Sequence, residues 1–118
     1  MSLGDLETAI RQRIPVTYVV VNNAAQGYVK GLQHVLFEGR YQSSDLKEMN
    51  YAEIARVMGA RGIRVEDPRD LAAALSEGIG ERTSPTVIDV MVTRNPGQML
   101  PGVDARAQIK VKPGDRPA

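Results

Sequence analysis

The chain has 118 residues, a formal net charge of +1, 42% hydrophobic and 25% charged residues, which are values typical of one globular domain. They exclude collagen-like and disordered chains. Cysteine is absent and His34 is the single histidine, which excludes disulfide scaffolds, thiolate nucleophiles and Cys or His zinc clusters. Because the sequence has no long basic run and no apolar run that could span a bilayer, we expect a cytoplasmic protein with no nucleic-acid partner and no membrane partner.

The first third of the chain predicts a helix, a strand and a second helix. Residues 2–13 begin with the spacing of a capping box and continue with apolar residues at helical spacing, until Pro15 ends the pattern. Residues 16–21 are apolar and β-branched, which is typical of a parallel strand buried on both faces. Turn-forming residues fill 22–27, and a helix is expected from there to about residue 39.

The middle of the chain predicts a helix and an edge strand. Asn50 opens a second capping box and Gly59 provides a stop, which places a helix over residues 51–58. Residues 62–66 alternate apolar and charged side chains, as a short edge strand does. We interpret Arg61 and Arg64 as part of a solvated edge.

The last elements are a helix, a strand and a tail. Asp67 and Pro68 have the residue types of an N-cap and a first helical position. Residues 86–92 form an apolar strand in which Asp89 is the polar exception, and we interpret Asp89 as structural. Residues 94–118 are rich in Pro and Gly and show no sustained period.

The alternation of helices and strands predicts an α/β fold with three layers, α/β/α, around a parallel sheet. The predicted domains are residues 1–93, which fold, and residues 94–118, a C-terminal tail. Ligands of such sheets bind beyond the carboxyl ends of the strands. The segment 22–27 occupies that position, so it is the first place to seek chemistry.

Several residues of this segment have suitable chemistry for a cation and an anion. Asn23 offers a neutral oxygen, and the small Ala24 and Ala25 leave backbone carbonyls accessible to a hard cation such as Mg²⁺. Gly27 allows close approach to a ligand, and a helix that begins there favours a phosphate. An Asn-Asn pair by itself is more often only a turn.

Ordered stretches along residues 3–92 resemble the thiamine diphosphate-dependent enzymes, in particular the C-terminal, pyrophosphate-binding domain of the acetolactate synthase-like branch. The stretches that carry the resemblance are Gly4 to Ala9, Ile14 to Val16, Val19 to Asn23 with Gly27, Tyr51 to Ala55, Met58 to Ala60, Gly62 to Pro68, Leu71, Ala74 to Leu75 and Pro85 to Val90. An ordered series is far more specific than any single motif.

The resemblance implies which residues bind the cofactors. In that family the cofactor motif opens with Gly-Asp-Gly and closes with Asn-Asn, and this sequence contains the closing half. The resemblance assigns Asn23 (side chain) and Ala25 (carbonyl) to Mg²⁺, and Asn23, Ala25, Gly27 and Tyr28 to the thiamine diphosphate site. It assigns no catalytic residue, because the motif aspartate and the family's activating glutamate have no counterpart here.

The resemblance also implies part of a six-stranded sheet, with about three of the six strands present and residues 86–92 between the other two. The expected function is the thiamine diphosphate and Mg²⁺-binding portion of a carboligase or decarboxylase acting on 2-keto acids. FAD is possible in the parent enzyme, and the expected partners are the missing N-terminal part or a homo-oligomer. Two alternatives stay open: a non-catalytic interaction module that kept the fold, and a generic nucleotide-binding α/β protein.

Overall fold

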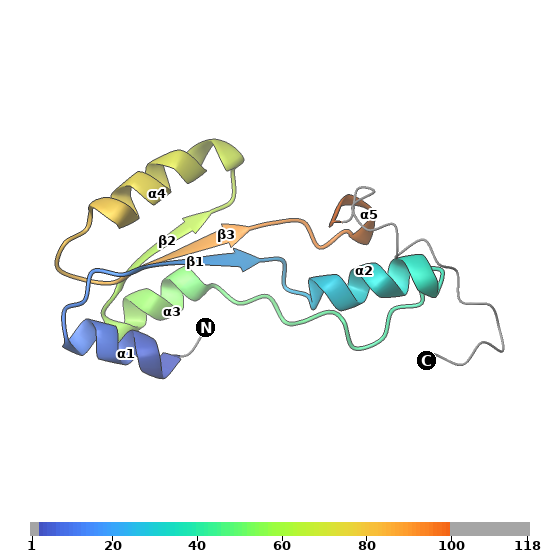
Figure 1. The fold of residues 1–118 in the computed structure, drawn as a ribbon, viewed down its shortest axis with the longest axis horizontal. Helices are drawn as coiled ribbons and strands as arrows, with labels where there is room; N and C mark the ends of the chain where they lie inside the picture. Colours follow the sequence, from blue (N-terminus) through green and yellow to red (C-terminus); the bar gives the residue numbers. More distant parts are fainter. Residues whose placement is uncertain (1–2, 100–118) are drawn as a thin grey trace. The chain divides into compact units, whose positions relative to one another are not determined.

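The computed structural model describes residues 3–99, and the chain divides into two compact units (Figure 1). The described part of the first, here called the sheet unit, comprises residues 3–22 and 49–92. The described part of the second, here called the helical unit, comprises residues 23–48 and 93–99.

The sheet unit contains a three-stranded parallel sheet in the order β1-β3-β2. Its elements are α1 (Leu3–Arg11), β1 (Thr17–Asn22), α3 (Tyr51–Met58), β2 (Arg61–Val65), the 3-10 helix η1 (Pro68–Asp70), α4 (Leu71–Gly80) and β3 (Thr86–Met91). Val19, Ile88 and Ile63 stand side by side in the register. The predicted parallel α/β fold is confirmed, and the last strand lies between the other two as the resemblance implied.

Helices cover both faces of this sheet and make two cores. On one face, Leu6 of α1 and Ala55 of α3 pack with Val87. On the other face, Ala74 of α4 packs with Ile88 and Val65. The sheet unit therefore has the predicted three layers, with β3 as its most buried strand.

The prediction that residues 16–21 are buried on both faces is wrong for β1. Tyr18 and Val20 pack against the core beneath α1 and α3, but Val19 is 47% and Val21 69% exposed on the opposite face. Among the described residues, β1 is an outer strand of the sheet, and no helix of the sheet unit covers these two valines. The sequence of an apolar strand predicts which side chains favour burial. It does not predict whether a helix packs over them, because that helix comes from another part of the chain.

The helix ends follow their predicted caps. The Asn50 side chain accepts a hydrogen bond from Glu53 N, and Gly59 ends α3 with φ +98°, in the left-handed region that favours glycine. Asp67 accepts from Arg69 N ahead of Pro68. The predicted helix after Pro68 is divided into η1 and α4.

The helical unit contains α2 (Gly27–Leu36) and the short α5 (Pro96–Met99). The α2 helix begins directly after the turn and ends three residues before Gly39, where helix was still expected. Of the predicted tail, residues 94–99 are described and include α5, whereas residues 100–118 lie outside the described part.

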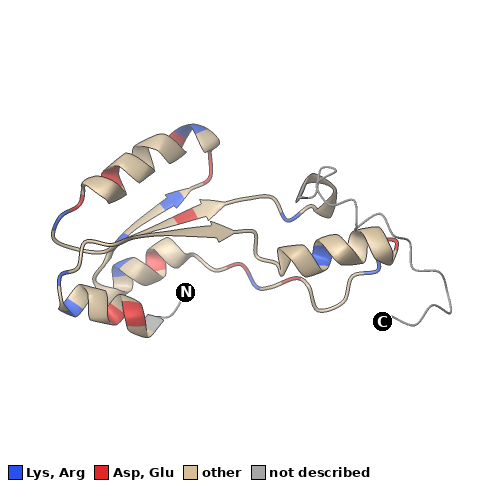
Figure 2. Cartoon of the chain, viewed as in Figure 1, with Lys and Arg blue, Asp and Glu red and all other residues tan. Residues whose placement is uncertain are grey.

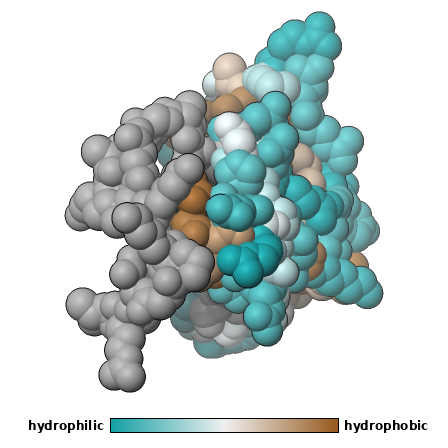
Figure 3. Space-filling model, turned by 90° about the vertical axis from the view of Figure 1, so that its right-hand side faces the viewer, coloured by the Kyte–Doolittle hydropathy of each residue, from teal (hydrophilic) through white to brown (hydrophobic). Residues whose placement is uncertain are grey.

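Charges of both signs are spread over helices and loops rather than gathered in one patch (Figure 2). The face shown in Figure 3 is mostly hydrophilic and includes an apolar area. No helix within residues 3–99 is both long and apolar enough to cross a membrane.

Candidate functional site

The three parallel strands end at one edge of the sheet, the edge at which α/β folds bind ligands. Asn22 is the last residue of β1, and it is 5% exposed. It is the first residue of the predicted segment 22–27, and the predicted site residues that follow it, Asn23, Ala25, Gly27 and Tyr28, belong to the helical unit.

Asn23 and Ala25 form a local turn. The Asn23 Oδ1 accepts a hydrogen bond from Ala25 N at 3.1 Å, which is the geometry of an Asx turn. Ala24, between them, has φ +49°, a left-handed conformation that is costly for alanine. The turn thus brings the amide oxygen of Asn23 and the backbone of Ala25 into one short loop.

A returning segment of the same unit holds this turn in place. Gln26 N donates to Ser44 O at 2.8 Å, and Leu46 N donates to Ala24 O at 2.8 Å, so that Ala25 and Asp45 face each other in an antiparallel bridge. These bonds offset the strain at Ala24. Ser44 is 1% exposed, and its Oγ has no hydrogen-bond partner among the residues that the structure describes.

The start of α2 follows the turn. Gln26 is the N-cap and its side chain makes no capping hydrogen bond, and the first turn carries no acidic residue. A helix N-terminus of this kind favours an anion. Gly27 is half-buried, while Tyr28 is 65% exposed.

Lys30 of α2 links the returning segment to the helix. Its side chain is 9% exposed and pairs with Asp45 at 2.5 Å, and its Nζ lies 5.2 Å from the centre of the Tyr41 ring. The Tyr41 hydroxyl lies 2.8 Å from His34 Nδ1. Sequence reasoning missed this cluster, because its members are 4 to 15 residues apart and follow no motif.

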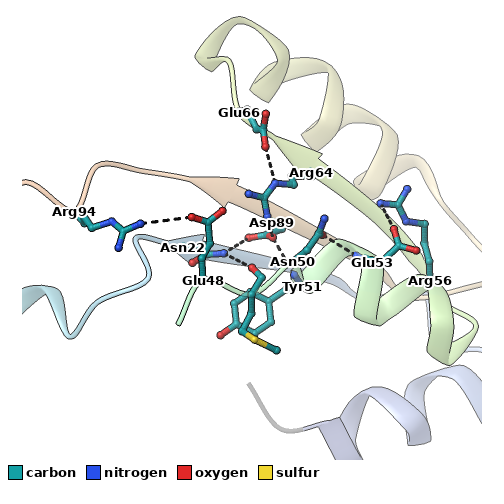
Figure 4. A network of polar contacts seen from close by, with 11 residues as sticks. Asn22, Glu48, Asn50, Tyr51, Glu53, Arg56, Arg64, Glu66, Asp89 and Arg94 are labelled. Carbon is teal, nitrogen blue, oxygen red and sulfur yellow. Dashed lines mark hydrogen bonds and ion pairs between the residues drawn. The ribbon is translucent and has the colours of Figure 1, made fainter. Parts of the chain in front are cut away.

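In the sheet unit, Asp89 is fully buried and is the centre of a polar network (Figure 4). Its Oδ1 accepts from Asn22 Nδ2 at 3.0 Å, and its Oδ2 accepts from Tyr51 N at 3.0 Å and from Arg64 Nη1 at 3.2 Å. The structural interpretation of Asp89 agrees with these contacts. The interpretation of Arg64 as solvated is wrong, because its side chain is 18% exposed and pairs with Asp89 as well as with Glu66.

The strand edge also has a cleft that sequence reasoning missed. A mostly apolar cleft of about 170 Å³ lies between the ends of β2 and β3 and the start of α4, lined by Val65, Asp67, Leu71, Val90 and Met91 among others. Its lining residues come from four elements, β2, η1, α4 and β3, so only the sheet order could have pointed to it.

The oxygen atoms of the turn provide only some of the ligands that a hard cation needs. Within residues 3–99 no group of three or more His, Cys, Asp or Glu residues could hold a metal ion. Asn23 and Ala25 instead offer an amide oxygen and a carbonyl oxygen, the ligand type of Mg²⁺, which takes about six ligands. These two oxygens would supply two of those ligands, so a Mg²⁺ site here would need further oxygens from phosphate or other groups.

A parallel, three-layer α/β unit with polar residues beyond its strand ends defines a ligand-binding α/β domain. The sequence matches the family described as thiamine pyrophosphate enzyme, C-terminal TPP binding domain, over residues 1–90. The chain belongs to this family.

Three relatives illustrate the similarity. The chain is 36% identical over 100 residues to sulfoacetaldehyde acetyltransferase of Castellaniella defragrans, covering 82% of this chain and 17% of that protein. It is 34% identical over 110 residues to the putative thiamine pyrophosphate-containing protein YdaP of Bacillus subtilis, covering 93% and 18%. It is 35% identical over 117 residues to the acetolactate synthase large subunit of Parasynechococcus marenigrum, covering 92% and 18%. The chain therefore spans less than a fifth of the length of these curated relatives.

Proposed function

We propose that this chain is the thiamine diphosphate and Mg²⁺-binding portion of an acetolactate synthase-like carboligase or decarboxylase that acts on 2-keto acids. Membership in the family supports the thiamine diphosphate part. The observation that carries the site assignment is the Asn23–Ala25 turn, which stands directly after β1 and at the start of α2.

In this proposal the residues of the turn bind the metal ion, and the residues at the start of α2 bind the cofactor. The Asn23 Oδ1 and the Ala25 carbonyl bind Mg²⁺, and an amide oxygen with two lone pairs accepts a hydrogen bond and ligates at once. Gly27 and Tyr28, at the start of α2, contact the diphosphate and the body of the cofactor. The buried Ser44 Oγ is an orphaned polar atom in the segment that backs the turn, which supports a polar ligand nearby.

The cofactor itself supplies the carbanion chemistry, while the chain orients it. The described residues contain no acidic cluster to complete the metal site. We therefore expect no decarboxylase or carboligase turnover from this chain alone, and we propose that a further N-terminal part or a homo-oligomer completes the site. FAD in such an enzyme and a cytoplasmic location remain expectations of the same kind.

A calorimetric titration tests the proposal. Thiamine diphosphate is titrated into the protein with Mg²⁺ and, as a control, with the metal removed by chelation. We expect binding that depends on the metal, because the turn offers oxygen ligands to the cation and no cationic side chain within residues 23–28 to the diphosphate. Equal affinity with and without Mg²⁺ would contradict the assigned metal ligands.

The second candidate is a non-catalytic interaction module that kept the fold. The uncovered valines of β1 favour it, since an exposed apolar strand is a surface for pairing with another chain. Submicromolar, metal-dependent binding of thiamine diphosphate by the 118-residue chain would exclude this candidate, and complete absence of binding would favour it.

A further inference from the structure

The chain passes between the two units at three places. In the sheet unit, hydrogen bonds within one group of residues connect the chain at all three places. The passages are 22 to 23, 48 to 49 and 92 to 93. The residues on the sheet side of these passages are bonded to one another through Asn22 and Asp89. We call this group the junction cluster, and its members are Asn22, Met49, Tyr51, Asp89 and Val92.

Asn22, at the first passage, is hydrogen-bonded directly to Met49 at the second and to Val92 at the third. Its Nδ2 donates to Met49 O at 2.9 Å and to Asp89 Oδ1 at 3.0 Å. Its backbone oxygen accepts from Val92 N at 3.0 Å. One buried residue thus joins the end of β1, the segment before α3 and the segment after β3.

Asp89 connects the junction cluster to α3 and β2. Its second oxygen accepts from Tyr51 N, the first residue of α3, and from Arg64 of β2 (Figure 4). A buried carboxylate is costly unless its oxygens are paired, and the Arg64 guanidinium and the helix N-terminus supply the pairing. Breaking one member of such a network leaves a buried polar atom unsatisfied, so the network favours a single arrangement.

We propose that Asn22 and Asp89 are positioning residues that hold Asn22 and Met49, the two residues of the sheet unit that flank segment 23–48 in the chain, and that this anchoring keeps the Asn23–Ala25 turn ready for its ligand. The second clause rests on the proposed function. Neither residue touches the cofactor in this proposal. The first clause concerns contacts within the sheet unit alone and stands without any ligand.

Hydrogen exchange of backbone amides in the full chain tests the first clause. The Tyr51 and Val92 amides report on the junction cluster, and the Arg61 and Thr86 amides, bonded to Pro85 O and Val16 O at the opposite end of the strands, serve as internal references. Asp89→Asn keeps the shape but offers a single acceptor oxygen. We expect the exchange rates of Tyr51 and Val92, relative to the references, to rise at least about tenfold. Tyr51 N donates to the Asp89 carboxylate itself, and Val92 N donates to the backbone oxygen of Asn22, whose side chain the same carboxylate holds.

Two further variants keep the test decisive. Val87→Ala is the matched control, since Val87 is fully buried on the same strand and has an apolar side chain, and it should raise all four rates together. Asn22→Ala leaves the Asp89 carboxylate beside Arg64 and carries the test if Asp89→Asn does not fold. Relative rates within twofold of the wild type in the folded variant, or an equal rise in Val87→Ala, would overturn the first clause.

Binding of thiamine diphosphate with Mg²⁺ to the same proteins tests the second clause. We expect about tenfold weaker binding in Asp89→Asn and less than twofold in Val87→Ala. Raised relative exchange with unchanged affinity would overturn the second clause. If the wild type does not bind while the exchange result holds, the proposed function fails and the positioning role of the junction cluster stands.

Discussion

At the scale of single residues, the two adjacent asparagines have different surroundings. Asn22 is buried, and its side chain donates to Met49 O and to Asp89. Asn23 is half-buried, and its Oδ1 accepts a hydrogen bond from Ala25 N, two residues further along the chain. A buried amide that donates two hydrogen bonds is suited to stabilise the fold. A half-buried amide oxygen in a turn is suited to bind a ligand.

The first prediction separates these two tasks. Asn23→Ala should weaken binding of thiamine diphosphate in the presence of Mg²⁺ by at least about tenfold, because it removes a metal ligand. Asn22→Ala should mainly lower the free energy of unfolding, by about 1–3 kcal/mol, because it leaves buried acceptors unpaired. Calorimetric titration and urea unfolding of both variants measure the two effects. If Asn23→Ala binds as the wild type does while Asn22→Ala abolishes binding, the ligand assignment is wrong by one residue.

The second prediction concerns Glu81, after the end of α4. Its carboxylate accepts from the Thr83 hydroxyl and amide, from Arg82 N and from Arg61, and these bonds lower the pKa of Glu81 from 4.5 to about 2. A lowered folded-state pKa contributes stability that is complete above the unfolded value and is lost as the pH falls toward the folded value. Glu81→Gln should therefore be less stable than the wild type at pH 6, and the difference should shrink between about pH 4.5 and 2.

Denaturant unfolding at several pH values, with the wild type as reference at each, measures this difference, and an NMR titration of the Glu81 side chain measures the pKa directly. A Glu81 that titrates near 4.5 would contradict the bonding around it.

At the scale of elements, local signals predicted more than long-range ones. The caps at Asn50, Gly59 and Asp67 depend on neighbours within three or four residues, so the sequence contains everything that determines them. The Arg64–Asp89 pair joins positions 25 residues apart, and the register of β2 against β3 creates it. That register is a property of the folded sheet, which explains why Arg64 was misinterpreted and the role of Asp89 was incompletely predicted.

The third prediction concerns the close approach of β2 to α3. A Cβ at Gly62 would lie 1.9 Å from the backbone oxygen of Ala52, whereas a Cβ at Gly80 would have no heavy atom within 4 Å. Gly62→Ala should therefore cost about 3 kcal/mol or more, since backbone atoms must move apart. Gly80→Ala, the matched control, should change stability by less than about 1 kcal/mol and in the favourable direction. Thermal unfolding compares them, and equal stabilities would contradict the described packing of α3 on β2.

At the scale of the whole molecule, the family and the fold were predictable because ordered stretches along most of the chain carry them. The oxygen chemistry of segment 22–27 suggested a cation site, the resemblance assigned Asn23 and Ala25 as its ligands, and these ligands remain predictions. The exposure of β1 depends on what lies beside the sheet, and the chain spans only 17–18% of the three relatives described above.

The fourth prediction is that the 118-residue chain associates in solution through β1. This strand, Thr17–Asn22, contains no charged residue and no proline, and Val19 and Val21 are exposed beside its outer edge. Such an edge pairs readily with another strand. Sedimentation at low micromolar concentration should show oligomers, and Val19→Lys with Val21→Lys should shift them toward monomer.

Val57→Lys is the control for that experiment, because Val57 is 82% exposed on α3 and remote in sequence from β1. It should leave association unchanged. A compact wild-type monomer with strong amide protection at residues 18–20 would show that the three strands suffice and that the edge does not drive association.

The measurement that tests the proposed cofactor site most directly is paramagnetic broadening by Mn²⁺, used in place of Mg²⁺ together with thiamine diphosphate. The fifth prediction is that the amide signals of residues 23–27 broaden first, that those of α4 near Gly80 persist, and that Asn23→Ala abolishes the selective loss. Broadening centred instead on the acidic residues Asp67 and Asp70, or no selective broadening with the cofactor present, would contradict the assignment of Asn23 and Ala25 to the metal.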